Sequence, residues 1–182
     1  MLLMENMKTE TTDITTIKKV IDLLLSTDGS TTLALETIVQ DTVQLNVIEQ
    51  EIVEKFSIPK EAKNFFSDKG TFLRRISSLS YKGDLLSENI VFSDLSLLQK
   101  EIRGELKVGE IPIGKLIKEI ETRRNILFKG YQPSGNILEL YDDFSLDSDI
   151  FPTKKYQIIR DNNCLFYICE VFHLDNISKF IK

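Results

Sequence analysis

Two charged residues lie within otherwise apolar stretches of the chain, and the first of them is basic. Arg74 lies between Phe72 and Ile76 in the stretch FLRRISSLSY, and the period of two in a strand places these three side chains on one face. A guanidinium stays charged inside a protein, so a buried Arg74 needs a carboxylate or a bound anion as its partner. The same alternation places Arg75 on the opposite face, where we expect it to contact solvent.

Glu170 is the acidic counterpart, in the stretch CLFYICEVF near the C-terminus. Both faces of this stretch are apolar, which predicts a central strand with Glu170 buried. An ion pair between Glu170 and Arg74 that only holds the sheet together would account for both residues. A ligand site would account for them equally well, so these two residues alone leave the choice open.

A third stretch, KVGEIPIGKLI, carries Gly109 and Gly114 around Pro112 and leads into a predicted helix from about Ile113. Backbone N–H groups at such a helix start can receive an anion or a carbonyl. In this order and spacing, the three stretches resemble the chorismate pyruvate-lyase family, which releases pyruvate from chorismate to leave 4-hydroxybenzoate. The resemblance rests on Leu73-Arg74, Gly109-x-x-Pro112-Ile113-Gly114, Thr122-Arg123 and Glu170-Val171-Phe172.

The resemblance implies a role for each matching residue. Arg74 would hold a substrate carboxylate, and Glu170 would act as a general acid whose pKa is raised by desolvation on its apolar strand. The further substrate contacts that the resemblance implies are Thr31, Ile113, Gly114 and Arg123. The product is aromatic, so the reaction is steeply downhill and we expect it to need neither a cofactor nor a metal. The expected ligands are chorismate and the aromatic product.

A second class of function stays open at this point. The same fold serves as the effector domain of bacterial transcription regulators, which binds a small molecule without turning it over. Those proteins carry an N-terminal winged-helix domain, whereas the first strand predicted here already begins near Asp41. Because both Arg74 and Glu170 are present, we expect an enzyme and keep the non-catalytic binding domain as the alternative.

Length and charge narrow the remaining possibilities. A chain of 182 residues with 42% hydrophobic content is enough for one domain with a real core, which we expect to span residues 1–182 with residues 1–12 disordered. The net charge of -5 argues against a nucleic-acid-binding surface. No apolar run suggests a signal peptide or a membrane span, so we expect a cytoplasmic protein, either a monomer or a small homo-oligomer.

Cysteine and histidine are too few for several other chemistries. Cys164 and Cys169 fall in one predicted strand with their side chains on opposite faces, so they cannot pair, which fits a reducing compartment. His173 and two divergent cysteines are too few ligands for a zinc site. No nucleotide-binding or metalloprotease motif occurs either.

The elements that must position these residues are hairpins with helices inserted between them. Strands are predicted at 41–53, 72–81, 85–92, 125–130, 155–160 and 164–173, and helices at 17–25, 31–35, 95–102, 113–121 and 175–182. Gly104 is expected to close the helix at 95–102, and the acidic segment 137–149 is expected to be a solvated excursion. This order predicts an α+β domain with an antiparallel sheet. The resemblance implies a chorismate lyase-like fold of six strands with flanking helices that close over an internal site.

Overall fold

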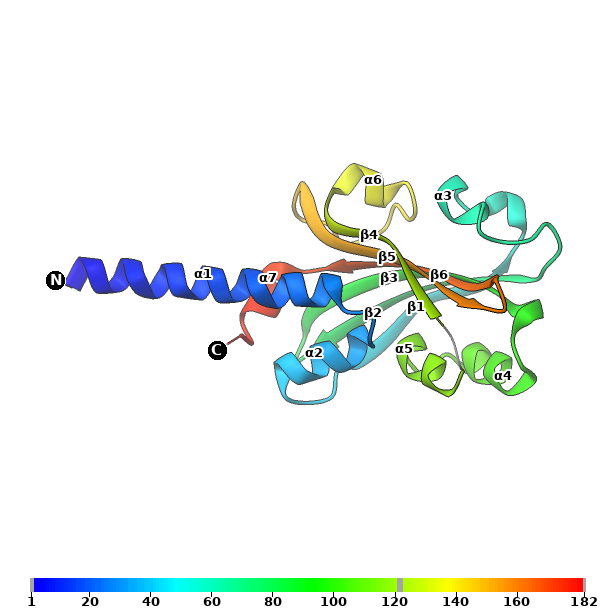
Figure 1. Cartoon of the computed structure of the whole chain (residues 1–182), viewed down its shortest axis with the longest axis horizontal. Helices are drawn as coiled ribbons and strands as arrows, with labels where there is room; N and C mark the ends of the chain where they lie inside the picture. The colour runs from blue at the N-terminus through cyan, green and yellow to red at the C-terminus, as the bar shows by residue number, and fades with distance from the viewer. Residues whose placement is uncertain (1, 121–122, 182) are drawn as a thin grey trace.

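Six antiparallel strands form the centre of the molecule, which confirms the expected α+β fold. The computed structural model describes residues 2–120 and 123–181, with side chains from residue 14 onward except that of residue 119. The strands lie in the order β1-β2-β3-β6-β5-β4 (Figure 1). Their bounds are β1 Gln44–Val53, β2 Phe72–Tyr81, β3 Asp84–Asp94, β4 Arg123–Pro133, β5 Ile150–Arg160 and β6 Asn163–Phe172. The central position predicted for the strand of Glu170 is confirmed.

Helices cover both faces of this sheet (Figure 1). The helices are α1 Leu2–Ser26, α2 Thr31–Val39, α3 Lys60–Lys63, α4 Lys100–Val108, α5 Ile113–Leu116, α6 Ser134–Leu138 and α7 Leu174–Ser178, and single 3-10 turns occur at Lys55–Ser57, Leu95–Leu97 and Ile117–Glu119. We call the face under α2, α4 and α5 the front face, which carries Val91 and Ile168. The face under α3 and α6 is the back face, which carries Ile90 and Val171.

Both predicted hairpins form, and their turns explain why. Lys82 and Gly83 join β2 to β3 with φ of 52° and 88°, and Asp161 and Asn162 join β5 to β6 with φ of 50° and 62°. Positive φ at both central residues is the turn geometry that matches the twist of paired strands, and glycine, asparagine and aspartate adopt it most readily.

The helix predicted at 95–102 has different bounds in the structure, where α4 begins at Lys100. Gly104 does not close a helix but lies inside α4, which ends at Gly109 instead. Gly109 has φ of 78° and its N–H donates to the carbonyl of Glu105. A left-handed glycine is the usual end of a helix, because it satisfies a free carbonyl at no steric cost.

A bulge in β6 corrects the expectation for the cysteines. Ile158 pairs with Phe166 but Ile159 pairs with Cys164, so Leu165 is an extra residue in the ladder. One extra residue reverses the alternation of side chains that precede it. The opposite-face prediction is therefore wrong: Cys164 and Cys169 both pack in the back-face core, and both are free thiols.

The acidic segment 137–149 is not simply solvated. Its carboxylates are exposed, but Leu140 and Phe144 are buried against the back face. The segment is fixed further by the backbone N–H of Ser145, which donates to Glu88. Alternating acidic and apolar residues therefore form a cover for the core, with only the carboxylates directed to water.

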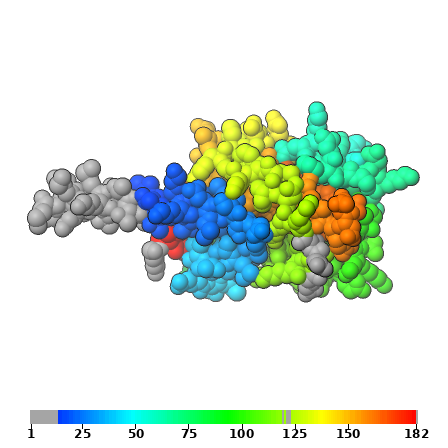
Figure 2. Space-filling view, viewed as in Figure 1, coloured from blue at the N-terminus to red at the C-terminus, as the bar shows by residue number. Residues whose placement is uncertain are grey.

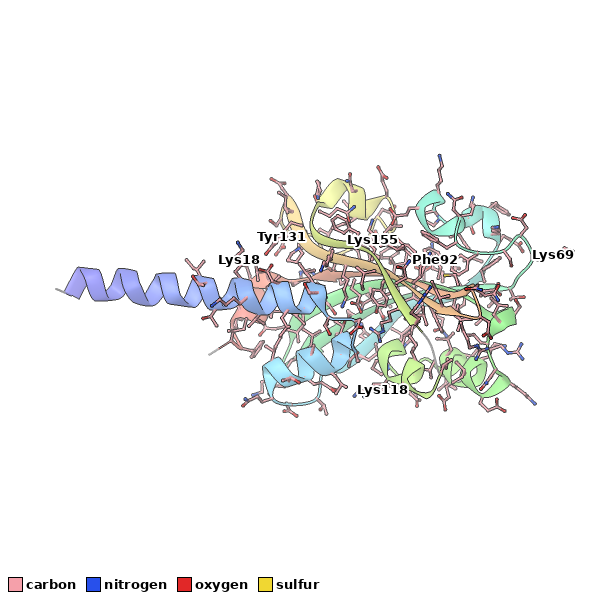
Figure 3. All side chains as sticks on the ribbon, in the orientation of Figure 1. Lys18, Lys69, Phe92, Lys118, Tyr131 and Lys155 are labelled. Atoms are coloured by element: carbon pink, nitrogen blue, oxygen red, sulfur yellow. The ribbon has the colours of Figure 1, made fainter. Side chains whose placement is uncertain are left out.

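The surface is charged, while the sheet encloses some charges of its own. Figure 3 shows Lys18, Lys69 and Lys118 at the periphery and Lys155 within the body, and of these four lysines only Lys155 is buried.

Figure 2 shows α1 and β4 side by side on one side of the molecule. Among the described residues, no helix is both long and apolar enough to cross a membrane. The side chains of residues 1–12 lie outside the described set, so the expected disorder of this segment stays a prediction.

Candidate functional site

A small cavity lies on the front face of the sheet, under α2 and α5. Its floor includes Asn89, Tyr156 and Glu170, and its cover includes Thr32 and Gly114. The enclosed volume is about 30 Å³, which is room for one or two water molecules. A ring-sized ligand would therefore enter only when the covering segments move.

Antiparallel pairing arranges the side chains of the floor in two parallel rows across β2, β3, β6 and β5. The first row is polar and consists of Ser77, Asn89, Glu170 and Lys154. The second row consists of Arg75, Val91, Ile168 and Tyr156. The front face thus has an apolar centre, Val91 and Ile168, with the cation Arg75 at one end of its row and Glu170 in the neighbouring row. Arg75 and Lys154 flank the cavity and are not among the residues that line it.

Glu170 is held by several donors. Thr31 Oγ1 donates to Oε2 at 2.7 Å, and Tyr156 Oη donates to Oε1 at 3.1 Å. Lys154 Nζ lies 3.5 Å from Oε2. Burial, with a smaller contribution from Glu170, raises the pKa of Tyr156 well above its ordinary value, so its phenol stays protonated and serves as a donor. The predicted contact residue Thr31 is thus brought directly to Glu170.

Lys154, like Tyr156, belongs to this group although no pattern in the sequence indicated it. Its side chain is fully buried, and Nζ donates to Thr31 Oγ1 at 3.1 Å and to the carbonyls of Leu24 at 3.2 Å and Thr27 at 3.4 Å. A buried ammonium needs such oxygens and a counter-charge. Lys154 therefore connects the end of α1 and the turn before α2 to Glu170.

Arg75 is the buried arginine of β2, and it has no carboxylate. Its side chain is only 1% exposed, and Nη2 donates to the carbonyls of Gly109 and Ile111 at 3.2 Å each. Nε and Nη1 are buried without a partner among the described residues. None of the ion pairs in residues 2–120 and 123–181 includes Arg75. Burial lowers its pKa to about 10, which leaves a charged guanidinium at neutral pH.

The structure corrects the prediction for Arg74. Arg74 lies on the back face, opposite to Glu170, where it forms ion pairs with Glu49 and, at 2.8 Å, with Glu51. A bulge in β1 after Val47 brings both glutamates to that face. The Arg74 side chain is 28% exposed and therefore half-buried, and the two glutamates neutralise its charge. The expectation of a solvated Arg75 is wrong, because α4 and the glycine loop cover the front face.

A similar shift by one residue occurs in β4. Arg123 is exposed, whereas Arg124 donates to the carbonyl of Gly29 and its guanidinium carbon lies 5.3 Å from the centre of the Tyr156 ring. Such a distance allows a cation–π contact. Arg124, rather than the predicted Arg123, therefore lies over Tyr156, a residue that lines the cavity, and Thr122 of the same motif falls outside the described residues.

The cover of the cavity is made where α2 meets α5. The predicted contacts Ile113 and Gly114 line the cavity from α5. Lys115 Nζ in α5 forms an ion pair with Glu36 Oε1 in α2 at 2.9 Å. A Cβ on Gly114 would lie 3.0 Å from Ser30 Oγ, so glycine allows this close approach. Two separate chain segments thus close over the floor.

Comparison with known proteins places these residues in a family context. The sequence profile of the family described as "Chorismate pyruvate-lyase Rv2949c-like" matches residues 25–181. The chain is also 29% identical to a protein of Methanocaldococcus jannaschii named "Putative lyase MJ0807", over 82% of this chain and 76% of that protein.

Solved structures share the fold at much lower identity. A GntR-family transcriptional regulator from Enterococcus faecalis V583 superposes with a TM-score of 0.51 and 11% identity, over 73% of this chain and 95% of that chain. The gene product SA0254 from Staphylococcus aureus gives a TM-score of 0.54 and 10% identity, over 82% of this chain and 90% of that chain. At these identities the likeness concerns the fold alone.

Proposed function

The chain belongs to the Rv2949c-like chorismate pyruvate-lyase family, and on this premise we propose that it eliminates pyruvate from chorismate to give 4-hydroxybenzoate. One observation supports the proposal most strongly. Arg75 is a buried cation without a counter-charge among the described residues, and it shares the front face with the anchored carboxylate of Glu170. A buried charge without a partner is costly unless a ligand supplies the missing anion.

The spacing of the two groups suits a ring with different substituents at its two ends. The backbone of Arg75 lies two strands from that of Glu170, which is about 10 Å across the sheet. It also lies one row further along the strands, which is about 7 Å. Val91 and Ile168 form the apolar surface between them. In our proposal the ring lies on this surface, with its carboxylate on the guanidinium of Arg75 and its opposite end at Glu170.

The elimination breaks the bond between ring carbon C3 and the ether oxygen and removes the proton from C4. The electron pair of the C4–H bond completes the aromatic ring, and enolpyruvate leaves, takes a proton from solvent and tautomerises to pyruvate. Donors surround the carboxylate of Glu170, an arrangement that favours an acceptor of the C4 proton over the general acid expected from the sequence. Arg75 would orient the ring so that C4 faces Glu170.

The test is to incubate the purified protein with chorismate, without metal or nucleotide, and to measure pyruvate and 4-hydroxybenzoate by chromatography. We expect equimolar products above the spontaneous background. Glu170→Gln, which keeps the shape of the side chain, should abolish most of the turnover. Binding of chorismate without any product would instead favour the alternative, a non-catalytic domain that binds a small molecule.

A matched pair of variants tests the assignment of the arginine. Arg75→Met should lower kcat/KM by at least about 30-fold, since a buried partner of a charged group is lost. Arg74→Met removes the same charge from the back face and should leave kcat/KM unchanged. Retained activity in Arg75→Met together with loss in Arg74→Met would show that the substrate carboxylate is not bound where we place it.

A further inference from the structure

The carboxamide of Asn89 is a buried polar group that the proposed reaction does not use. Asn89 lies in the middle of β3, is 8% exposed and lines the cavity. Its Oδ1 is enclosed and has no hydrogen-bond partner within the described part of the chain. Enclosing such an acceptor without a partner destabilises a protein, so an apolar residue would suit a central strand better.

The position of Asn89 relates it to one end of the cavity. Asn89 is directly opposite Glu170 on one side and Ser77 on the other, in the polar row of the floor. Arg75 lies in the neighbouring row, on the strand next to β3 and away from Glu170. A ring bound by Arg75 through its carboxylate would therefore present its opposite end to Asn89 and Glu170.

The two oxygens of Glu170 already accept hydrogen bonds from Thr31 and Tyr156. Asn89 Oδ1, in contrast, has its full capacity as an acceptor, and the amide nitrogen can donate to the same group. A ring hydroxyl both donates and accepts, so it matches a carboxamide. A methyl group or a hydrogen at that ring position would leave Oδ1 without a partner.

We propose that Asn89 binds the ring hydroxyl para to the carboxylate and thereby makes the site specific for 4-hydroxylated rings. This inference rests on the proposed function and adds the residue that recognises the second end of the ligand. A site that hydrogen-bonds a hydroxyl discriminates against the analogue that lacks it, because the buried partner is then left unsatisfied. The expected discrimination is about 10- to 100-fold in Kd.

Calorimetry with 4-hydroxybenzoate and benzoate at neutral pH tests this inference. The wild-type protein should bind 4-hydroxybenzoate about 10- to 100-fold more tightly than benzoate. In Asn89→Leu, which has the same branched shape but is apolar, the two Kd values should become equal within error. Ser87→Ala is the matched control, because Ser87 is a buried residue of β3 that does not line the cavity, and its hydroxyl has no partner among the residues that the structure describes. This control should keep the wild-type preference.

The outcomes separate this inference from the proposed function. Equal binding of the two ligands by the wild-type protein would overturn the role of Asn89, and so would a preference that persists in Asn89→Leu. Melting temperatures show whether the variant folds, and Asn89→Val, which is also apolar, replaces it if it does not. Failure of both ligands to bind, together with no turnover of chorismate, would instead reject the proposed function itself.

Discussion

Lys154 and Glu170 form an ion pair that is buried beside the cavity, and its strength can be measured. Lys154→Met keeps most of the side-chain volume but leaves Glu170 without a counter-charge, so we expect the free energy of unfolding at neutral pH to fall by about 2–4 kcal/mol. Glu170→Gln in the same background should restore most of this loss, because the uncompensated charge is then removed. Urea unfolding of both single variants and the double variant gives the coupling energy. Additive losses would show that the two groups do not interact.

At the scale of residues, the sequence identified Glu170 and the loop around Gly114, but it assigned both arginines one position too early. Alternation along a strand defines two faces, and it does not say which face borders a cavity when helices cover both. Small polar side chains in this strand do not distinguish the faces either, because Ser77 and Ser78 place one buried serine on each face. The bulge that brings Glu49 to Arg74 leaves no trace in the sequence.

The interior of α4 contains a glycine whose replacement should stabilise the protein. Gly104 is exposed, and a Cβ at this position would meet no atom within 4 Å. Gly104→Ala should therefore raise the free energy of unfolding by about 0.5–1 kcal/mol, since alanine loses less backbone entropy in a helix. Gly109→Ala is the opposite control, because its φ of 78° is strained for any residue with a Cβ. Thermal unfolding of both variants checks these signs, and a destabilised Gly104→Ala would contradict the helix bounds.

The ion pair between Lys115 and Glu36 joins the two segments that cover the cavity, so it should slow the release of a bound ring. Glu36→Gln should increase the dissociation rate of 4-hydroxybenzoate by about two- to five-fold, the effect of a partly exposed ion pair. Stopped-flow dissociation at low and high salt measures this rate, and added salt should accelerate the wild-type protein more than the variant. Asp84→Asn, which breaks the distant ion pair with Lys179, is the control. Equal rates in all three proteins would mean that the cover opens without breaking this contact.

At the scale of elements, strands were easier to predict than helix ends. Both hairpins follow from local turn residues such as Lys82-Gly83, and local signals are visible in a sequence. The end of α4 was placed at Gly104 because a glycine inside a helix and a glycine after one look alike until φ is known. A bulge such as the one at Leu165 reverses which face of the sheet the side chains beyond it occupy. Because bulges depend on how neighbouring strands twist together, this reversal was not predictable from the sequence.

At the scale of the whole molecule, the fold alone does not decide between an enzyme and a sensor. Two solved structures at about a tenth sequence identity, one of them a transcriptional regulator, share the fold, so the fold fixes where side chains can lie and the residues decide the chemistry. The same sheet separates two environments in this chain. The front face holds the proposed site, while the back face holds a core that includes both cysteines.

This separation makes the two thiols reporters of the stability of the whole domain. Cys164 and Cys169 are 8% and 0% exposed, and burial raises the pKa of each thiol to about 12. At pH 8 both groups are therefore protonated and enclosed, and an alkylating reagent needs an accessible thiolate. We expect alkylation of the native protein to be slower than that of the urea-unfolded protein by orders of magnitude, with both cysteines reacting at one rate. Mass spectrometry of the modified protein resolves the two sites.

Ligand binding on the front face should slow this reaction on the back face, although no ligand atom would contact a cysteine. If alkylation requires global unfolding, a ligand that binds only the folded state lowers the unfolded fraction by the factor 1 + [L]/Kd. Saturation with 4-hydroxybenzoate at about 100 times its Kd should therefore reduce both alkylation rates about 100-fold. Cys164 lies beside the bulge, where the ladder is interrupted, and it would be the first to react through local opening. Rapid labelling of Cys164 that the ligand does not slow would show that this end of β6 opens independently of the site.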